Sequence, residues 1–305
     1  MNKKKATYIS INTISQLHQV LGLPKCQHPL ISLIKLDTCP PILEASIHYS
    51  SNLYSISLKK NVRGKLKYGQ KQYDFNEGLL TFIAPKQVVV SESTNGIEAS
   101  GWWLLFHPDF IRNYPLGKTI KDYGYFSYAV NEALFLSDKE EKTLEDILNN
   151  IEQEYYTNID QFSQDVMVSH LDVLLNYSNR FYNRQFLTRK SASSDVLVNL
   201  ENLLTDYFNS EKIQEQGLPS VHYFAEKLNV SANYLSDMLR NLTGQSTQQH
   251  IHNKLIEKAK EKLSITNLSV SEIAYQLGFE HSQSFSKLFK RKTTQSPLEF
   301  RASFN

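Results

Sequence analysis

The chain has 305 residues, of which 41% are hydrophobic and 21% are charged, values typical of a globular protein of about two domains. No run approaches the roughly 20 apolar residues that cross a membrane, and Cys26 and Cys39 lack metal-ligand or redox spacing, so we expect a cytoplasmic protein with no membrane partner. The net charge of +2 divides unevenly, since residues 219–305 carry 11 Lys and Arg against seven Asp and Glu, which slightly favours DNA as a partner.

The first half of the chain reads mainly as β-strands. Segments rich in aromatic and β-branched residues occur at Leu53–Leu58, Gly64–Phe75, Gly78–Pro85 and Ser100–Pro108. Several short strands joined by turns are typical of a barrel or a sandwich. Trp102 and Trp103 are adjacent, so on a strand they face opposite sides, and one of them would face the interior as core or as pocket wall.

Two long helices are predicted after the strands. Ser137 with Glu140 or Glu141 indicates a helix start, and this helix runs to about Tyr156. The second helix extends over about Asp160–Arg184 and carries a broad apolar band. The band consists of Phe162, Val166, Leu171, Leu174, Leu175, Tyr177, Phe181 and Tyr182. It fits two roles equally, packing against the strands or forming a dimer interface.

A further helix and a polar stretch come next. The run Ser191–Ser194 can cap a helix at Asp195–Phe208. The polar stretch Ser210–Ser220 contains Gly217 and Pro219, residues that interrupt regular structure. It is therefore the best candidate for a domain boundary.

Two stretches near the C-terminus, Val221–Gly244 and Val270–Thr294, follow one plan. Each begins with an apolar helix face at i, i+3, i+4 and i+7, followed by a tight turn and a second amphipathic helix. The first-helix faces are Val221, Phe224, Ala225 and Leu228, and Val270, Ile273, Ala274 and Leu277. The inner faces of the second helices are Leu235, Leu239 and Leu242, and Phe285, Leu288 and Phe289. This is the helix-turn-helix layout, whose second helix can enter a major groove.

Local signals set the ends of these helices. Ser269 and Glu272 form a capping box, and Ser231 can cap the second helix of the first copy. Gly278 stands where the chain must turn sharply, a position that favours positive φ, and Asn229 holds the corresponding place in the first copy.

The outer faces of the two second helices carry hydrogen-bonding side chains. They are Asn233, Ser236, Asp237 and Arg240 in the first copy, and Gln283, Ser286, Lys287, Lys290, Arg291 and Lys292 in the second. Asn and Gln can pair with adenine, Lys can donate to guanine, and Asp can accept from cytosine. The basic residues further along each helix fit phosphate contacts, which add affinity and salt dependence but no sequence reading. We therefore predict a DNA-binding surface on both helices.

A connecting helix is predicted between the two copies, at Thr247–Leu263. Its apolar stripe is Ile251, Leu255, Ala259 and Leu263. At ~1.5 Å per residue the helix would be roughly 25 Å long. Such a rigid spacer can hold two recognition helices on one face of DNA about one helical turn (~34 Å) apart.

The segment Leu218–Arg301 resembles the DNA-binding domain of AraC/XylS-type transcription regulators. The matching residues are LNVSANYLSDMLRNLTG, IEKAKEKL, SVSEIAYQLGF, SFSKLFKRKT and SPLEFR. The resemblance implies seven helices, two helix-turn-helix units, a linking helix and base contacts from the outer faces. The sequence departs from the family pattern in three places: Ser284 replaces an aromatic residue, Thr294 replaces glycine, and Asp237 is acidic.

The N-terminal half is similar to the sensor domains of this family, which are cupin-like barrels followed by dimerising helices. KLKYGQKQYDFNEGLLTFIAP, GWWLLFHP and NYSNRFYNRQF carry that resemblance. It implies a sensor and dimerisation domain at residues 1–188, a connecting helix and linker at 189–218, and a double helix-turn-helix domain at 219–305.

Metal-dependent or nucleophilic chemistry is not indicated. Metal-binding cupins gather two or three histidines and a carboxylate, whereas the strand region offers only His48 and His107, far apart. The chain also lacks a Ser/His/Asp arrangement and a phosphate-cradling glycine loop. We therefore predict no catalytic residues, no metal site and no cofactor, and no residue identifies an effector site.

The predicted fold is α+β, with an N-terminal cupin-like β-barrel and trailing helices, and a C-terminal all-α domain with two helix-turn-helix units. The predicted function is a sequence-specific transcription regulator, not an enzyme, with promoter DNA as its partner. Further candidate partners are RNA polymerase, a small-molecule effector, and a second copy joined through the helices at 138–184. Two alternatives stay open: a cupin-type enzyme with a DNA-binding appendage, and a constitutive architectural DNA binder with a structural barrel.

Overall fold

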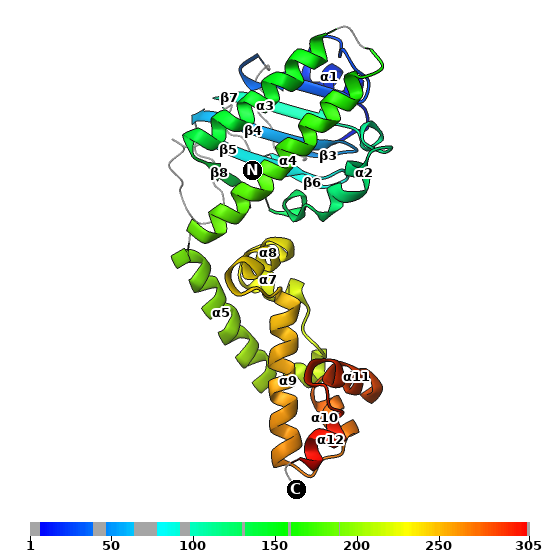
Figure 1. Ribbon diagram of the computed structural model, residues 1–305, viewed down its shortest axis with the longest axis vertical. Helices are drawn as coiled ribbons and strands as arrows, with labels where there is room; N and C mark the ends of the chain where they lie inside the picture. Colours follow the sequence, from blue (N-terminus) through cyan, green and yellow to red (C-terminus); the bar gives the residue numbers. More distant parts are fainter. Residues whose placement is uncertain are drawn as a thin grey trace, which may run out of the picture. The chain divides into compact units, whose positions relative to one another are not determined.

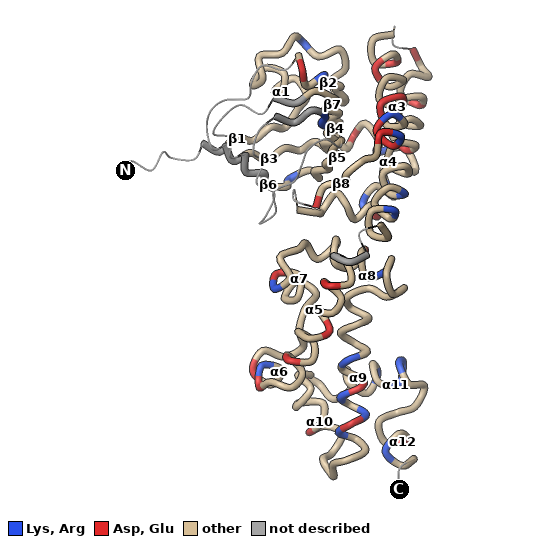
Figure 2. Tube along the Cα trace, turned by 90° about the vertical axis from the view of Figure 1, so that its left-hand side faces the viewer, with Lys and Arg blue, Asp and Glu red and all other residues tan. Residues whose placement is uncertain are grey.

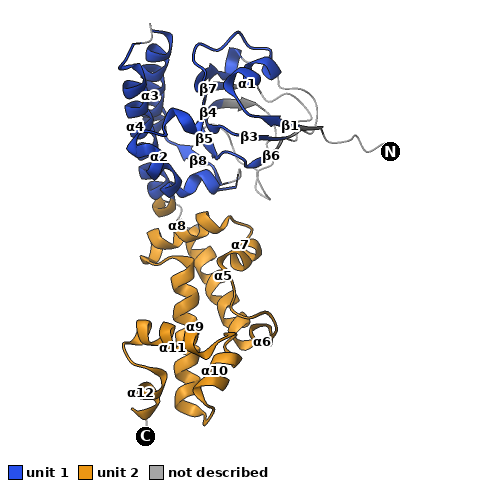
Figure 3. Ribbon diagram, turned by 90° about the vertical axis from the view of Figure 1, so that its right-hand side faces the viewer, with its two compact units in different colours: residues 1–185 blue, residues 186–305 orange. Residues whose placement is uncertain are grey.

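The computed structural model describes residues 7–38, 47–63, 78–91, 98–129, 132–157, 160–188 and 190–303. The chain divides into two compact units, an N-terminal unit (Met1–Gln185) and a C-terminal unit (Phe186–Asn305) (Figure 3). Residues 189–218, which we predicted to connect two domains, lie with the C-terminal unit. The strand predicted at Gly64–Phe75 lies outside the described residues, as do Cys39 and the side chain of His48.

The described strands of the N-terminal unit form two sheets (Figure 1). The three-stranded sheet, in the order β1-β3-β6, contains β1 (Thr7–Ile11), β3 (Ile47–Ser51) and β6 (Val88–Ser91). The five-stranded sheet, in the order β2-β7-β4-β5-β8, contains β2 (Ile31–Lys35), β4 (Tyr54–Arg63), β5 (Gly78–Ile83), β7 (Glu98–Phe106) and β8 (Leu134–Leu136). β1 and β3 are parallel, and the other neighbouring pairs are antiparallel. The strands predicted around Leu53–Leu58, Gly78–Pro85 and Ser100–Pro108 are confirmed as β4, β5 and β7.

Three layers make up the N-terminal unit. Figure 2 shows α3 (Asp138–Tyr156) and α4 (Ser163–Thr188) on one side of the five-stranded sheet and the three-stranded sheet on the other. The β-rich character of this region is therefore confirmed. No pairing joins the two sheets among the described strands, so the closed cupin-like barrel stays a prediction.

Helices α3 and α4 cover one face of the five-stranded sheet. Lys60 on β4 donates to Glu141 and Glu145 on α3 at 2.6 and 2.8 Å, and the ring of Phe82 lies 6.3 Å from that of Tyr182 on α4. The predicted apolar band of α4 is divided. Its buried members are Leu171, Leu174, Leu175, Phe181 and Tyr182, whereas Phe162 and Val166 are exposed. Most of the band therefore packs within the unit, and its N-terminal end faces solvent.

The opposite face of this sheet packs against α1 (Ile14–Leu21). The apolar cluster there contains Ile11, Ile14, Leu17, Ile34, Leu53 and Leu105. Trp103 packs against this cluster. Trp102 lies beneath Lys35, whose Nζ is 4.8 Å from its ring centroid, and Lys35 pairs with Glu152 on α3. The two tryptophans therefore lie on opposite faces, as predicted.

The C-terminal unit is helical. Its helices are α5 (Lys190–Asn209), α6 (Lys212–Gln216), α7 (Val221–Lys227), α8 (Ala232–Thr243), α9 (Thr247–Ile265), α10 (Val270–Gln276), α11 (Ser282–Thr293) and α12 (Pro297–Ala302). The resemblance implied seven helices for Leu218–Arg301. In this fully described range the structure has six, α7 to α12. α5 packs against α8 and α9 from outside that range. None of the described helices is long and apolar enough to cross a membrane.

Candidate nucleic-acid interface

Two helix-turn-helix units, α7–α8 and α10–α11, lie in the C-terminal unit as predicted. Ser231 caps α8 by accepting from the backbone N–H of Tyr234 at 3.2 Å. Ser269 and Glu272 form the predicted capping box at the start of α10. The predicted inner faces are buried at Leu235, Leu239, Phe285, Leu288 and Phe289. Because these inner faces are buried, the other face of each recognition helix, α8 and α11, points towards solvent.

The turns inside the two units use positive φ, as predicted. Asn229 has φ 55° and Gly278 has φ 80°. Gly278 meets a second constraint, because a Cβ there would lie 2.8 Å from the backbone C of Gly217 and 2.8 Å from the carbonyl O of Ile213. Only glycine allows this approach. The end of α6 therefore packs directly on the turn of the second helix-turn-helix.

The duplication extends past the recognition helices into a third helix. Capping boxes formed by Ser246 with Gln249 and by Ser296 with Glu299 begin α9 and α12. The turns before these two helices each contain one residue with positive φ. In the first copy it is Gly244 with φ 74°, and in the second it is Thr294 with φ 67°. A β-branched residue in this region is strained. The family departure at Thr294 thus carries an energetic cost.

Helix α9 connects the two helix-turn-helix units. Its predicted stripe is buried at Ile251, Leu255, Ala259 and Leu263, and its 19 residues give a length of roughly 28 Å at the usual rise of ~1.5 Å per residue. α8, α10 and α12 all pack against α9. Figure 1 shows α8 near one end of α9, whereas α10 and α12 lie near the other end. A single continuous helix therefore fixes one helix-turn-helix relative to the other.

The outer face of α8 is partly engaged in internal contacts. Asn233 is exposed. The hydroxyl of Ser236 lies 3.0 Å from that of Thr247, a fully buried residue on α9. Asp237 accepts from Arg240 Nη1 at 2.6 Å. The acid that departs from the family pattern is thus paired with the only basic side chain of this fully described helix, and the charges of the face cancel.

The outer face of α11 is basic. Gln283, Lys287, Lys290 and Arg291 are exposed, and the hydroxyl of Ser286 donates to the carbonyl of Ser282 at 3.0 Å. α11 has four Lys and Arg and no acid in its fully described sequence, and Figure 2 marks basic residues on it in blue. The positive potential reaches α9, where burial lowers the pKa of His252, and Lys292 and Arg291 lower it further.

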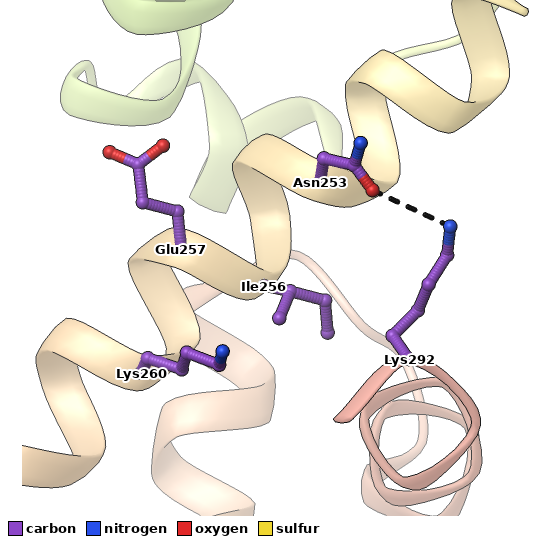
Figure 4. A pocket seen from close by; sticks show the side chains of 5 residues that line it. All are labelled: Asn253, Ile256, Glu257, Lys260 and Lys292. Atoms are coloured by element: carbon purple, nitrogen blue, oxygen red, sulfur yellow. Dashed lines mark hydrogen bonds between the residues drawn. The ribbon is translucent and has the colours of Figure 1, made fainter. Parts of the chain in front are cut away.

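A hollow of about 320 Å³ lies between α9 and α11 (Figure 4). It is lined by Asn253, Ile256, Glu257, Lys260 and Lys292. Lys292 Nζ donates across it to Asn253 Oδ1 at 3.5 Å. Sequence reasoning grouped Lys292 with the phosphate contacts of α11, but this weak bond draws it towards α9.

His107, one of the two histidines considered as metal ligands, has a structural role. His107 Nδ1 accepts from the backbone N–H of Asp109 at 3.2 Å and caps the short helix after β7. In the described part of the chain no three His, Cys, Asp or Glu side chains are placed to hold a metal ion.

The chain is similar to known helix-turn-helix proteins over its C-terminal part. Residues 224–303 match a family model described as a helix-turn-helix domain. The HTH-type transcriptional activator RhaS of Escherichia coli O139:H28 is 32% identical over 118 residues, which is 38% of this chain and 41% of that protein. RhaS of Citrobacter koseri is 30% identical over 140 residues, 46% of this chain and 45% of that protein. The chain thus spans less than half the length of these curated relatives.

Solved structures also match this part of the chain. The C-terminal domain of the two-component response regulator yesN from Fusobacterium nucleatum is 32% identical, with a TM-score of 0.28, and the match covers 34% of this chain and 98% of that one. The family model and the RhaS proteins coincide with the repeated helices described above. Residues 224–303 of this chain therefore form a helix-turn-helix domain, similar to those of AraC/XylS-type transcription regulators.

Proposed function

We propose that the chain is a sequence-specific DNA-binding transcription regulator whose recognition helices α8 and α11 enter adjacent major-groove segments of a promoter. One observation carries the proposal. Two helix-turn-helix units joined by the continuous helix α9 both turn polar faces to solvent. A helix of this kind fits the major groove, where side chains reach base edges.

The side chains divide into base-reading and phosphate-binding roles. Gln283 suits adenine and Lys287 suits guanine, while Lys290 and Arg291 suit phosphates. In α8, Asn233 is the exposed base-reading candidate. Ser236 and Ser286 keep acceptor capacity alongside their internal bonds. Asp237 can reach cytosine, and Arg240 can reach a phosphate, only if their mutual ion pair opens.

The N-terminal unit is proposed to sense an effector within a cupin-like barrel and to mediate dimerisation. Support for dimerisation comes from exposed apolar side chains on the helices at 138–184 and just before α4. Tyr156, Phe162, Val166 and Val173 are 63%, 59%, 39% and 43% exposed. Pairing with a second copy would remove this apolar surface from water. An effector would act only through unequal affinity for two arrangements of the protein.

The test is selection of DNA from a randomised duplex pool by the full chain, followed by affinity measurements on the selected site. We expect Gln283→Ala with Lys287→Ala to weaken specific binding by about 1–3 kcal/mol for each base that is no longer recognised. Lys212→Ala on α6 is the matched control, since it removes an exposed charge that belongs to neither recognition helix. Selection of no preferred duplex, or equal weakening in the control, would contradict the proposal.

A further inference from the structure

The face of the five-stranded sheet opposite α3 and α4 carries a row of polar side chains. Lys60 bonds to α3, and side chains alternate along a strand. Lys59 therefore points to the other face, together with Ser55 and Ser57. The register of β4 places Ser57 beside Thr81 on β5 and beside Trp103 on β7.

Three of these side chains lack a hydrogen-bond partner within the described part of the chain. Trp103 Nε1 donates to Ser55 Oγ at 2.7 Å. No hydrogen bond or ion pair to any described residue engages the side chains of Ser57, Lys59 and Thr81. Ser57 is only 7% exposed, and burial lowers the pKa of Lys59. Burying an ammonium group and hydroxyls is costly unless an acceptor meets them.

The neighbouring strand presents no side chain at the position beside Lys59. The residue opposite Lys59 on β7 is Gly101, with φ 120°, where a Cβ would lie 2.2 Å from the carbonyl O of Leu58. This position must therefore stay without a side chain beside Lys59. In the three-stranded sheet across this face (Figure 2), burial raises the pKa of Tyr49 to about 12. Lys59 in one layer and Tyr49 in the other are thus both half-buried.

We propose that Ser57, Lys59 and Thr81 bind the carboxylate of a small organic acid, whose apolar body lies against Trp103. The ammonium supplies the counter-charge and the hydroxyls donate to the carboxylate oxygens. The inference deepens the proposed function and rests on it for one point, that this acid is the effector. The site itself does not depend on DNA binding.

The test uses thermal unfolding of the full chain with benzoate and hexanoate, compared with benzamide and hexanamide at equal ionic strength. We expect the acids, and not the amides, to raise Tm by about 2–4 °C. Lys59→Met should abolish the rise, and Lys118→Met, which removes an exposed lysine, should keep it. Without ligand, Lys59→Met should unfold at the same Tm or higher, because it removes an uncompensated charge.

Three results would overturn the inference: no rise with either acid, an equal rise in Lys59→Met, or a lower Tm of the unliganded Lys59→Met protein. If that variant does not fold, Ser57→Ala with Thr81→Val gives the same test, since it removes the hydroxyl donors. DNA affinity is measured separately on the selected duplex. Acid binding without any change in DNA affinity keeps the site and refutes its role as effector site, whereas failure to select DNA refutes the proposed function alone.

Discussion

The two helix-turn-helix units share their inner packing and differ in charge. Both bury apolar side chains at equivalent positions and both precede a capped third helix. On the outer faces, Asp237 neutralises Arg240 in α8, whereas α11 carries four basic side chains and no acid. The fold needs only the inner face, so the outer faces are free to differ. We expect α11 to supply most of the electrostatic affinity and α8 to contribute mainly selectivity.

The turns provide the largest expected difference between the units. Gly278→Ala would place a Cβ against the backbone of Gly217 and Ile213 at a positive φ, whereas Asn229→Ala changes φ preference alone. We expect decreases of about 3 kcal/mol and about 1 kcal/mol in the free energy of unfolding. Urea denaturation of the two variants measures both values. Equal decreases would show that the packing of α6 on this turn contributes nothing.

The salt dependence of DNA affinity should differ between the two recognition helices, and this is the second largest expected effect. Lys290→Ala with Arg291→Ala should lower the slope of log affinity against log salt by about 2, because each phosphate contact contributes about one unit. Arg240→Ala should lower it by clearly less than one unit, since Asp237 already neutralises that side chain. Titrations of the selected duplex at several salt concentrations give both slopes. A decrease of a full unit in Arg240→Ala would mean that its ion pair opens on DNA.

The smallest expected effect concerns the ends of the recognition helices. Thr294→Gly should stabilise the C-terminal unit by about 0.5–1 kcal/mol, because Thr294 holds φ 67° with a β-branched side chain. Gly244→Thr, the reverse change in the first copy, should destabilise it by a similar amount. Thermal or urea unfolding measures the pair, and a lower stability of Thr294→Gly would show that the threonine side chain is needed there.

Local signals explain why the C-terminal unit was predictable. Caps such as Ser231, turn positions such as Gly278 and the 3.6-residue apolar period all act within a few residues of each other. Ser236 shows the limit of that reasoning. The helical period assigns it to the outer face, but its bond to Thr247 depends on how α9 leaves α8. α6 was missed because its sequence is polar, and only the burial of Ile213 marks it.

The N-terminal unit was harder to predict because its strands pair over long distances. β1 pairs in parallel with β3, although β2 comes between them in the sequence and belongs to the other sheet. No local pattern indicates that pairing. The apolar band of α4 gave no sign of which residues would stay exposed, since that depends on the sheet it covers. The alternation of Ser55, Ser57 and Lys59 with Ile56 and Leu58 was visible, and it could have indicated a polar face.

The contact between Gly217 and Gly278 has a consequence for biosynthesis. The segment at the end of α6 leaves the ribosome well before the turn against which it packs. The first helix-turn-helix can thus form while the segment that leads into it still lacks its contact with the second. Closure of the whole C-terminal unit waits for the last third of its own sequence, so a product truncated before Gly278 would leave the end of α6 without this contact.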